Sequence, residues 1–326
     1  MLLPFGMGAP RKRMNPQVAQ QVNRAFDALF MEQVARPIKK LQAPWNPCNT
    51  GRPPHSPRVV IFCCILKVMT CRTYEGIEAY VTCMAEDIQQ LFQVTRVPGH
   101  TVIHRGMYQV GMQYIRKLTT MMVLECRQRG MAIAVDSSGF RTDSTSKWFD
   151  IRTRKEQRRQ EYLKLHIAID VITGIIHGFT ITPGRAHESP EFERLMKQLP
   201  NVGKVVADKA FSSRKNCQIV AHKKGTPYLC FKDNATGRAK GSPAWSRSFQ
   251  DYQNHHEAWM NEYHGREMVE AVFSSIKQRW NESIASRNGW LRWRELALKA
   301  LVYDIKQLLC YQRAQELGVD LWITVE

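Results

Sequence analysis

The chain has 326 residues, of which 44% are apolar, and its 47 Lys and Arg against 29 Asp and Glu give a net charge of +18. This length allows two domains and a sizeable core, while the longest apolar run, Val59–Leu66, is too short to span a membrane. The basic excess favours a polyanionic partner, nucleic acid before an acidic membrane surface. The N-terminal segment places its apolar part before its basic part, the reverse of a secretory signal, so we expect a cytosolic protein.

The front section, from Gln17 to about Arg129, has helical apolar spacing throughout. Residues 17–34 predict one helix, and a Pro-rich connector follows from Pro37 to Pro57. Further helical patterns cover 58–71, 74–92 and 101–126. We therefore predict an all-helical unit before the first strand.

Strand patterns begin at Met131. "MAIAVDSS" predicts a buried strand that ends in an acid, and residues 162–182 predict two strands joined across Asp170–Gly174. A helix follows from the N-cap Ser189, then the strand "KVVADKA", a helix over 212–224 and the strand "PYLCF". A polar basic loop at about 232–247 leads into helices that dominate to the C-terminus. This mixed order predicts an α/β layer fold.

The cysteines and histidines give no metal framework. The nine cysteines include no CxxC pair and lie mostly in apolar stretches, so we expect reduced core residues. The sequence also contains no HExxH motif, and we expect no zinc site.

Two acids, Asp136 and Asp208, each end a short apolar strand, where α/β sheets place ligands. A buried carboxylate needs a partner or a metal, and oxygen ligands suit Mg²⁺. A third acid from a helix, Glu270, would complete a two-metal site. The alternative is that each aspartate is an ordinary turn or cap residue.

A stripe of polar residues marks the helix pattern around "REMVEAVFSSIKQRW", residues 266–280. If the helix reaches back to Tyr263, then Tyr263, Arg266, Glu270 and Lys277 fall within roughly 60° of arc, because each residue turns the helix by about 100°. Arg and Lys in this stripe are suited to phosphate. The alternative is an ordinary i,i+4 surface pair of Arg266 with Glu270.

These residues together carry a family resemblance. "AVDSSGF" around Asp136, "VVADKAFSS" around Asp208 and the spacing Tyr263(x2)Arg266(x3)Glu270(x6)Lys277 resemble the DDE transposases of the IS4/IS5 insertion-sequence superfamily, over roughly residues 55 to 310. The resemblance implies an RNase H-like mixed sheet flanked by helices over 129–326. It also implies a helical DNA-binding domain over 1–128, with a helix-turn-helix-like part at about 57–110.

The function implied by the resemblance is that of a DNA transposase. Asp136, Asp208 and Glu270 would be its catalytic residues and the ligands of two Mg²⁺ ions, with Mn²⁺ able to substitute. The enzyme would hydrolyse phosphodiester bonds at transposon ends and join the 3′-OH to target DNA. Its partners would be double-stranded DNA, namely the terminal inverted repeats and the target, bound by a dimer or higher assembly in the nucleoid.

Alternatives to this function remain open. The chain could be a DNA-binding protein derived from a transposase that no longer cleaves, or a related metal-dependent nuclease without strand transfer. Arg266 and Lys277 would contact phosphates near the transposon end, with Tyr263 beside them. Tyr263 acting as a recombinase nucleophile is the rival interpretation of that residue.

Three further groups are candidate DNA contacts. Thr101, His104 and Arg105 would lie on the exposed face of the last helix-turn-helix element, although Thr101 could simply cap a helix.

The other two groups lie in connections. The basic run 152–159, with Arg152, Arg154 and Lys155, would contact phosphate or else form a solvated loop. The insertion at about 232–247 carries Trp245, which would either stack on a displaced base, as in some relatives with a longer β-insertion, or lie in the core.

Overall fold

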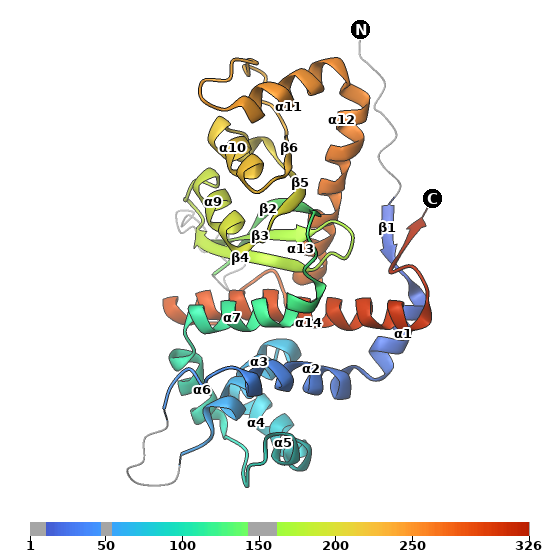
Figure 1. Ribbon diagram of the computed structural model, residues 1–326. Coiled ribbons are helices and arrows are strands. Elements are labelled where there is room, and N and C mark those ends of the chain that lie inside the picture. The colour runs from blue at the N-terminus through green and yellow to red at the C-terminus, as the bar shows by residue number, and fades with distance from the viewer. Residues whose placement is uncertain (1–10, 47–53, 143–161, 326) are drawn as a thin grey trace, which may run out of the picture.

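The computed structural model describes residues 11–46, 54–142 and 162–325, which form one mixed sheet and two groups of helices (Figure 1). The five sheet strands are β2 (Met131–Arg141), β3 (Tyr162–Asp170), β4 (Ile176–Pro183), β5 (Val202–Ala207) and β6 (Thr226–Leu229). Their order is β4-β3-β2-β5-β6. The pairs β2–β3 and β3–β4 are antiparallel, whereas β2–β5 and β5–β6 are parallel. The prediction of an α/β fold is therefore confirmed.

The front section forms helices from Pro16 to Cys126. They are α1 (Pro16–Arg24), α2 (Phe26–Lys40), α3 (Pro57–Thr70), α4 (Tyr74–Cys83), α5 (Ala85–Phe92), α6 (His100–Gln109), α7 (Met112–Val123) and the 3₁₀ turn η1 (Leu124–Cys126).

The predicted single helix over 17–34 was wrong. Ala25 has φ −114° and ψ 17°, which breaks the segment into α1 and α2. The predicted connector also began too early, because α2 continues through Pro37 to Lys40. Pro37 lies in the last turn of α2, so the helix ends soon after the residue whose missing N–H weakens it.

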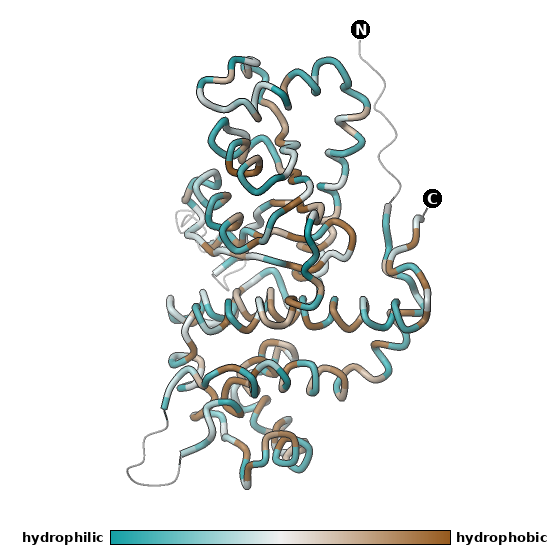
Figure 2. Tube along the Cα trace, in the orientation of Figure 1, coloured by the Kyte–Doolittle hydropathy of each residue, from teal (hydrophilic) through white to brown (hydrophobic). Residues whose placement is uncertain are grey.

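The remaining helices surround the sheet. They are α9 (Ser189–Gln198), the 3₁₀ turn η2 (Lys209–Phe211), α10 (Arg214–His222), α11 (Pro243–Asn254), α12 (His256–Tyr263), the 3₁₀ turn η3 (His264–Arg266), α13 (Glu267–Trp280) and α14 (Gly289–Leu317). The helices α9 and α10 pack on one face of the sheet, and α7, α13 and α14 pack on the other. Figure 2 shows apolar residues in the sheet strands, with α11 and α12 largely hydrophilic.

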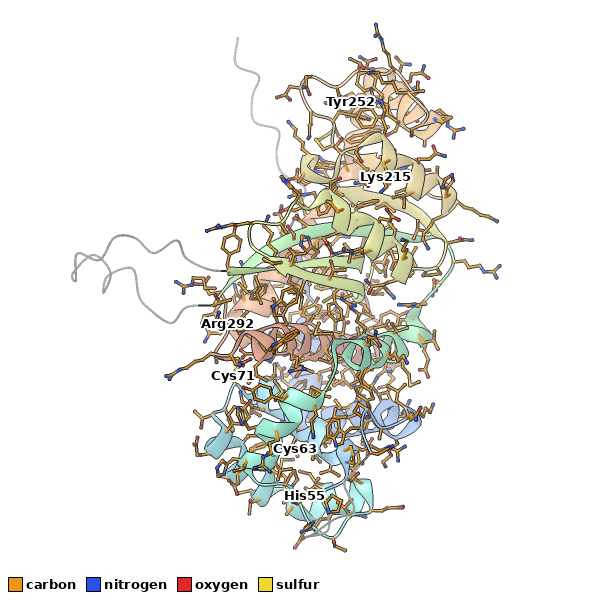
Figure 3. All side chains as sticks on the ribbon, turned by 90° about the vertical axis from the view of Figure 1, so that its left-hand side faces the viewer. His55, Cys63, Cys71, Lys215, Tyr252 and Arg292 are labelled. Carbon is orange, nitrogen blue, oxygen red and sulfur yellow. The ribbon has the colours of Figure 1, made fainter. Side chains whose placement is uncertain are left out.

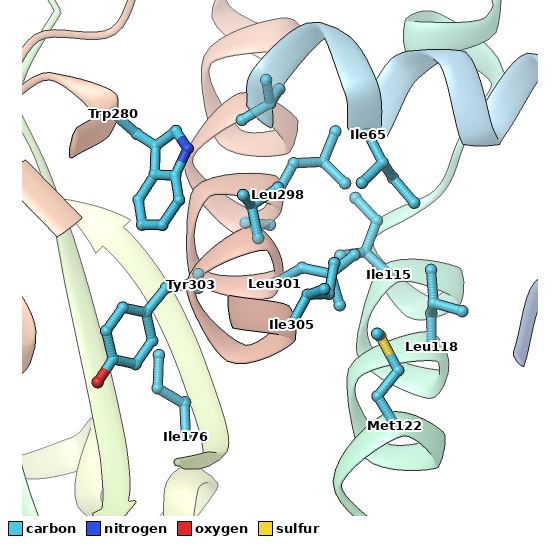
Figure 4. Close-up of a cluster of buried hydrophobic side chains, with 14 of the residues drawn as sticks. Ile65, Ile115, Leu118, Met122, Ile176, Trp280, Leu298, Leu301, Tyr303 and Ile305 are labelled. Carbon is cyan, nitrogen blue, oxygen red and sulfur yellow. The ribbon is translucent and has the colours of Figure 1, made fainter. Parts of the chain in front are cut away.

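The long helix α14 lies between the sheet and the front helices. Its residues Leu298, Leu301 and Ile305 face Ile65 of α3 and Ile115 of α7, while Tyr303 faces the strand β4 (Figure 4). All of these side chains belong to one continuous hydrophobic cluster. The front helices therefore share one hydrophobic core with the half of the chain that contains the sheet.

A second, two-stranded sheet joins the two ends of the described chain. It pairs β1 (Arg11–Met14) with β7 (Trp322–Val325), and Asn15 N–H donates to Leu321 O at 2.9 Å. Trp322 Nε1 donates to Ile172 O at 2.8 Å in the β3–β4 turn. Gly174 in that turn has φ +71°, and a Cβ there would lie 3.1 Å from Trp322.

The structure adds two observations on the composition. No helix in the described residues is both long and apolar enough to cross a bilayer. Cys63, Cys64, Cys217 and Cys310 are buried as free thiols, whereas Cys71 and Cys83 are exposed.

Figure 3 shows the molecule from the side. The sheet lies between the front helices, near His55, and the end of the molecule formed by α10 and α11, near Lys215 and Tyr252.

Candidate functional site

Two aspartates meet where the parallel pairing of β2 and β5 ends. The last Cα partners are Val135 and Ala207, so Asp136 and Asp208 are the next residue on each strand. Ala134 and Val206, two residues earlier, lie in the large cluster with α13 and α14. Because side chains alternate along a strand, Asp136 is directed to that same face, and Asp208 leaves β5 on that side.

The predicted end of the first strand was wrong. Asp136 lies inside β2, which continues to Arg141 because β3 continues to pair with it up to Tyr162. Only the parallel pairing with β5 stops at Asp136. Asp208 follows its strand directly, as predicted.

Each aspartate accepts a hydrogen bond from the next backbone N–H. Ser137 N–H donates to Asp136 Oδ1 at 2.8 Å, and Lys209 N–H donates to Asp208 Oδ1 at 2.7 Å. One carboxylate oxygen of each aspartate is thus used locally. The other is free of this contact and can interact across the site.

The helical stripe is built from three elements instead of one helix. Tyr263 ends α12, the 3₁₀ turn η3 contains Arg266, and α13 begins at Glu267. Gly265 lies within η3, where a Cβ would come within 3.2 Å of Val171. The condition for the predicted stripe, a single helix that reaches back to Tyr263, is therefore not met. A 3₁₀ turn has about three residues per turn, which keeps Tyr263 and Arg266 on one side, so the stripe itself stays a prediction.

Arg266 links two of the three candidate catalytic acids. Its Nη1 lies 2.8 Å from Glu270 Oε1, and its Nη2 lies 3.3 Å from Asp136 Oδ2. The surface pair of Arg266 with Glu270 therefore forms, but the same guanidinium also reaches a sheet residue. Glu270 is 57% exposed and Asp136 only 16% exposed, so the link joins a solvated acid to a nearly buried one.

The three acids do not form a metal-binding cluster in this conformation. Within residues 11–46, 54–142 and 162–325, no three His, Cys, Asp or Glu side chains are arranged to hold a metal ion. The expected convergence of Asp136, Asp208 and Glu270 on shared cations is thus not seen. In this conformation the guanidinium of Arg266 bridges Asp136 and Glu270.

The electrostatics of the site favour added positive charge. Burial raises the pKa of Asp136, and the neighbouring Asp208 and Glu188 raise it further, although Ser137 N–H and Arg266 act in the opposite direction. For Arg266, burial acts to lower the pKa, yet Asp136, Tyr263 and the other acids raise it above its ordinary value. The carboxylates thus favour the charged form of Arg266. The single contact with Arg266 does not offset the effect of burial on the Asp136 carboxylate.

Tyr263 and Lys277 lie on either side of the acids. Tyr263 stacks on Trp259 with ring centroids 5.5 Å apart, and its pKa is raised by burial and by Cys230, with which it shares a hydrogen bond. Lys277 Nζ lies 5.4 Å from the ring centroid of Phe140 on β2. The predicted DNA contacts at both positions stay predictions.

Glu188 is a fourth acid of this region, which the sequence analysis did not single out as a site residue. It precedes α9, shares a hydrogen bond with Ser137 and pairs with Lys164 Nζ at 2.8 Å, and its charge affects the pKa of Asp136. A cleft of about 710 Å³ adjoins it, lined also by the cations Arg185 and Lys232. The signal was present in the sequence, since Glu188 follows a strand that ends at the same edge of the sheet.

The front-section candidates lie on α6. Thr101 and Arg105 are exposed, and His104 is half-buried, with its ring against Tyr74 and Tyr108 at 4.8 and 5.2 Å between centroids. The basic-run candidates lie outside the described residues: they are Arg152, Arg154 and Lys155.

Trp245 lies in the core. It is 5% exposed, its Nε1 donates to Thr236 O at 2.8 Å, and its ring packs edge-on against Phe231. An indole held in this way has no free face for a base, because Arg214 covers it at 4.9 Å. Of the two interpretations of Trp245, the structure therefore favours the core one in this conformation, and stacking on DNA stays a prediction.

The chemistry of the donors fits a hard divalent cation. Asp136 and Asp208 offer carboxylate oxygens from adjacent positions, and burial raises the pKa of Asp136. Glu270 already binds a cationic group shared with Asp136. Arg266 must move before all three can bind one ion.

Comparisons with known proteins identify relatives of this arrangement. The family model described as "Transposase DDE domain" matches residues 127–305. No curated protein matches the chain. Among solved structures, the cryo-EM structure of a piggyBac transposase synaptic complex with hairpin DNA is similar at 9% identity and a TM-score of 0.41, covering 95% of this chain and 79% of that one.

Proposed function

The chain belongs to the transposase DDE domain family, whose model matches more than half of it, and from this premise we propose that Asp136, Asp208 and Glu270 are the catalytic carboxylates of a DNA transposase. The observation that carries the proposal is the placement of Asp136 and Asp208 side by side at the end of the parallel β2–β5 pairing. Arg266 ties the third acid, Glu270, to the first. The enzyme cleaves at the ends of a mobile element and joins the freed 3′-OH to target DNA.

The fold assignment that goes with this function is an RNase H-like core. Three antiparallel strands followed by two parallel ones, in the order β4-β3-β2-β5-β6, support it. In functional terms residues 129–326 act as the catalytic unit and residues 1–128 as a DNA-binding unit with a helix-turn-helix-like part at about 57–110. The shared core around α14 joins these units rigidly.

The proposed cofactor is Mg²⁺, two ions per site, with Mn²⁺ as a substitute. Asp136, Asp208 and Glu270 would hold it, and it would supply Lewis acidity at the phosphodiester. The side chains themselves set the conditions for its binding. The carboxylates supply negative charge in a partly desolvated site, and Arg266 balances that charge when no cation is bound.

We propose that the DNA backbone binds to the basic side chains that surround the three acids. Arg266 and Lys277 bind phosphates near the transposon end, with Tyr263 beside them, because a guanidinium fork and an ammonium both suit phosphate. Lys164 and Arg185 line the cleft on the α9 side. On the front helices, the exposed side chains of α6 contact DNA away from the acids.

A second candidate function is DNA binding without cleavage, in a protein derived from a transposase. The observation that favours it is the bridging guanidinium of Arg266, which leaves no cluster of three carboxylates in the described chain. The two functions differ in one respect that can be measured. A transposase requires a conformation in which Arg266 no longer contacts Asp136 and Glu270, whereas a DNA-binding protein does not.

The experiment that tests the proposal uses duplex DNA that carries the inverted repeats flanking the gene, with Mg²⁺ or Mn²⁺. Strand transfer supports the transposase, cleavage without joining indicates a nuclease, and binding without nicking indicates the derived binding protein. Asp136→Asn, Asp208→Asn and Glu270→Gln should each abolish cleavage and leave DNA binding intact. Asp251→Asn, an exposed acid on α11, is the matched control; cleavage by the triple variant would refute the assignment.

A further inference from the structure

A basic groove, separate from the cleft beside Glu188, lies on the side of α13 that faces away from the sheet. It encloses about 550 Å³ between α13, α14 and the β1 strand. Four cations line it, two from the N-terminal strand and two from the helices: Lys12, Arg13, Arg279 and Lys306. Ser274 and Gln278 of α13 add neutral polar groups to its wall.

The wall that carries Lys12 and Arg13 is held by the fold. Lys12 pairs with Thr324 and Arg13 with Ile323 across the two-stranded sheet. Trp322, the first residue of β7, is anchored to the β3–β4 turn by its indole hydrogen bond to Ile172. The two cations therefore project from a supported strand, so less conformational entropy is lost when they bind a ligand than for a free terminus.

The charge of the groove is uncompensated. No Asp or Glu lines it, and within the described parts of the chain none of its four cations pairs with a carboxylate. Lys306 Nζ has a neutral partner, Asn23 Oδ1, at 3.1 Å. Grouped like charges without acids are a costly arrangement unless an anion binds there.

The α13 wall of the groove begins close to Glu270 around the helix. At about 100° per residue, Ser274 lies 4 × 100 − 360, or about 40°, from Glu270, and Gln278 lies 8 × 100 − 720, or about 80°. Lys277 lies at about −20° on the same scale. Less than a quarter turn of the helix thus separates Glu270 from Ser274 and Gln278.

The length of the groove matches a polymer better than a single anion. Its α13 wall runs from Ala271 to Arg279, a rise of about 12 Å at 1.5 Å per residue. One DNA strand presents a phosphate about every 3.4 Å along the duplex axis, so a duplex aligned with α13 would place about three phosphates along this length. Four cations over that length match a nucleic acid backbone.

We propose that the groove between α13, α14 and β1 binds the sugar-phosphate backbone of the DNA duplex whose other part lies at Asp136, Asp208 and Glu270. Only the identity of that duplex as the cleaved one rests on the proposed function. The backbone passes from Lys277 over the α13 face of Ser274 and Gln278 to the cations of β1. The proposed contacts are to phosphate and sugar, which carry no sequence information directly.

The test measures the salt dependence of duplex binding by the full chain. The binding constant K falls as salt rises, and each phosphate contact contributes about −0.9 to the slope of log K against log salt. The double variant Lys12→Ala/Arg13→Ala should therefore make this slope less negative by about 1.8. The control is Lys197→Ala/Lys215→Ala, which removes the same charge from two lysines that pair with Glu193. A slope change equal to that of the control overturns the proposal.

A second variant keeps the strand intact. Gln278→Glu adds one negative charge to the groove without a change of shape, whereas Gln253→Glu adds it on the exposed face of α11. We expect only the first to weaken duplex binding and to remove hydroxyl-radical protection of the deoxyribose from about three nucleotides of one strand. Equal effects of both variants on duplex binding would contradict the proposal. So would a result in which Gln278→Glu weakens binding to phosphatidylserine vesicles but leaves duplex binding unchanged.

The two proposals can fail separately. If wild-type protein transfers strands and the groove variants bind with unchanged slope, the groove is not a DNA site although the enzyme assignment stands. If the slope becomes less negative as expected but no divalent ion supports cleavage, the groove stands and the catalytic assignment fails.

Discussion

The replacement Arg266→Met tests the candidate site most directly. A divalent ion that binds both Asp136 and Glu270 must displace two charge-assisted contacts of Arg266, at 3.3 and 2.8 Å. The Glu270 contact is more than half exposed, and we count it at about 0.5 kcal/mol. The Asp136 contact is mostly shielded and counts for roughly 1.5 kcal/mol. The sum, about 2 kcal/mol, corresponds to roughly 30-fold in a binding constant.

We therefore expect Arg266→Met to bind Mn²⁺ about 30-fold more tightly than the wild type in the absence of DNA. The electron paramagnetic resonance signal of free Mn²⁺ measures this, because bound Mn²⁺ loses that signal. Arg266→Lys keeps a cation near the acids and should stay within a few-fold of the wild type. If folded Arg266→Met binds Mn²⁺ no more tightly, or if adding Asp136→Asn leaves its affinity unchanged, the reasoning is refuted.

Three further predictions concern the core. Asp304 is fully buried, and among the residues that the structure describes Ile176 N–H donates to its Oδ1 while its Oδ2 has no partner. Burial raises the pKa of Asp304 well above its ordinary value, so the charged carboxylate destabilises the fold as the pH rises from the unfolded to the folded pKa. Asp304→Asn should raise the Tm at pH 7 by roughly 2–4 °C per kcal/mol gained, with no gain below the ordinary Asp pKa; calorimetry at both pH values checks this. Gly106→Ala should cost about 1–3 kcal/mol in urea unfolding, because the new Cβ would lie 2.2 Å from Val60, and a Val60→Ala background should remove most of that cost. Leu301→Ala should cost about 2–5 kcal/mol and shift the front helices and the sheet in a single transition; two separated transitions would contradict the shared core.

The sequence predicted the strands well because each has its own local pattern. The β3–β4 hairpin turn fell where Asp170 and Gly174 indicated it, and Asp170 accepts hydrogen bonds from Ile172 and Thr173 there. The extent of β2 was underestimated because it depends on pairing with β3, across a connection that no local pattern describes. Strand length in a sheet is set by the partner as much as by the strand itself.

The contacts that sequence could not predict are those between distant segments. The Arg266–Asp136 contact joins residues 130 positions apart, and periodicity within one helix gives no sign of it. The β1–β7 pairing joins two four-residue segments from opposite ends of the chain, too short to show a strand period. The choice of Arg266, Glu270 and the two aspartates as one site came instead from their family spacing.

The position of α14 has a consequence for where such a protein would cut. Because α14 packs at once against α3, α7 and β4, one continuous hydrophobic cluster connects the front helices to the sheet that carries the acids. A duplex bound both at α6 and at the acids would therefore have a fixed distance between these two contacts. The number of base pairs from a recognised sequence to the broken bond would then be set by the protein scaffold, and insertion of a single pair into the DNA between them would shift the register of contacts instead of being absorbed by the protein.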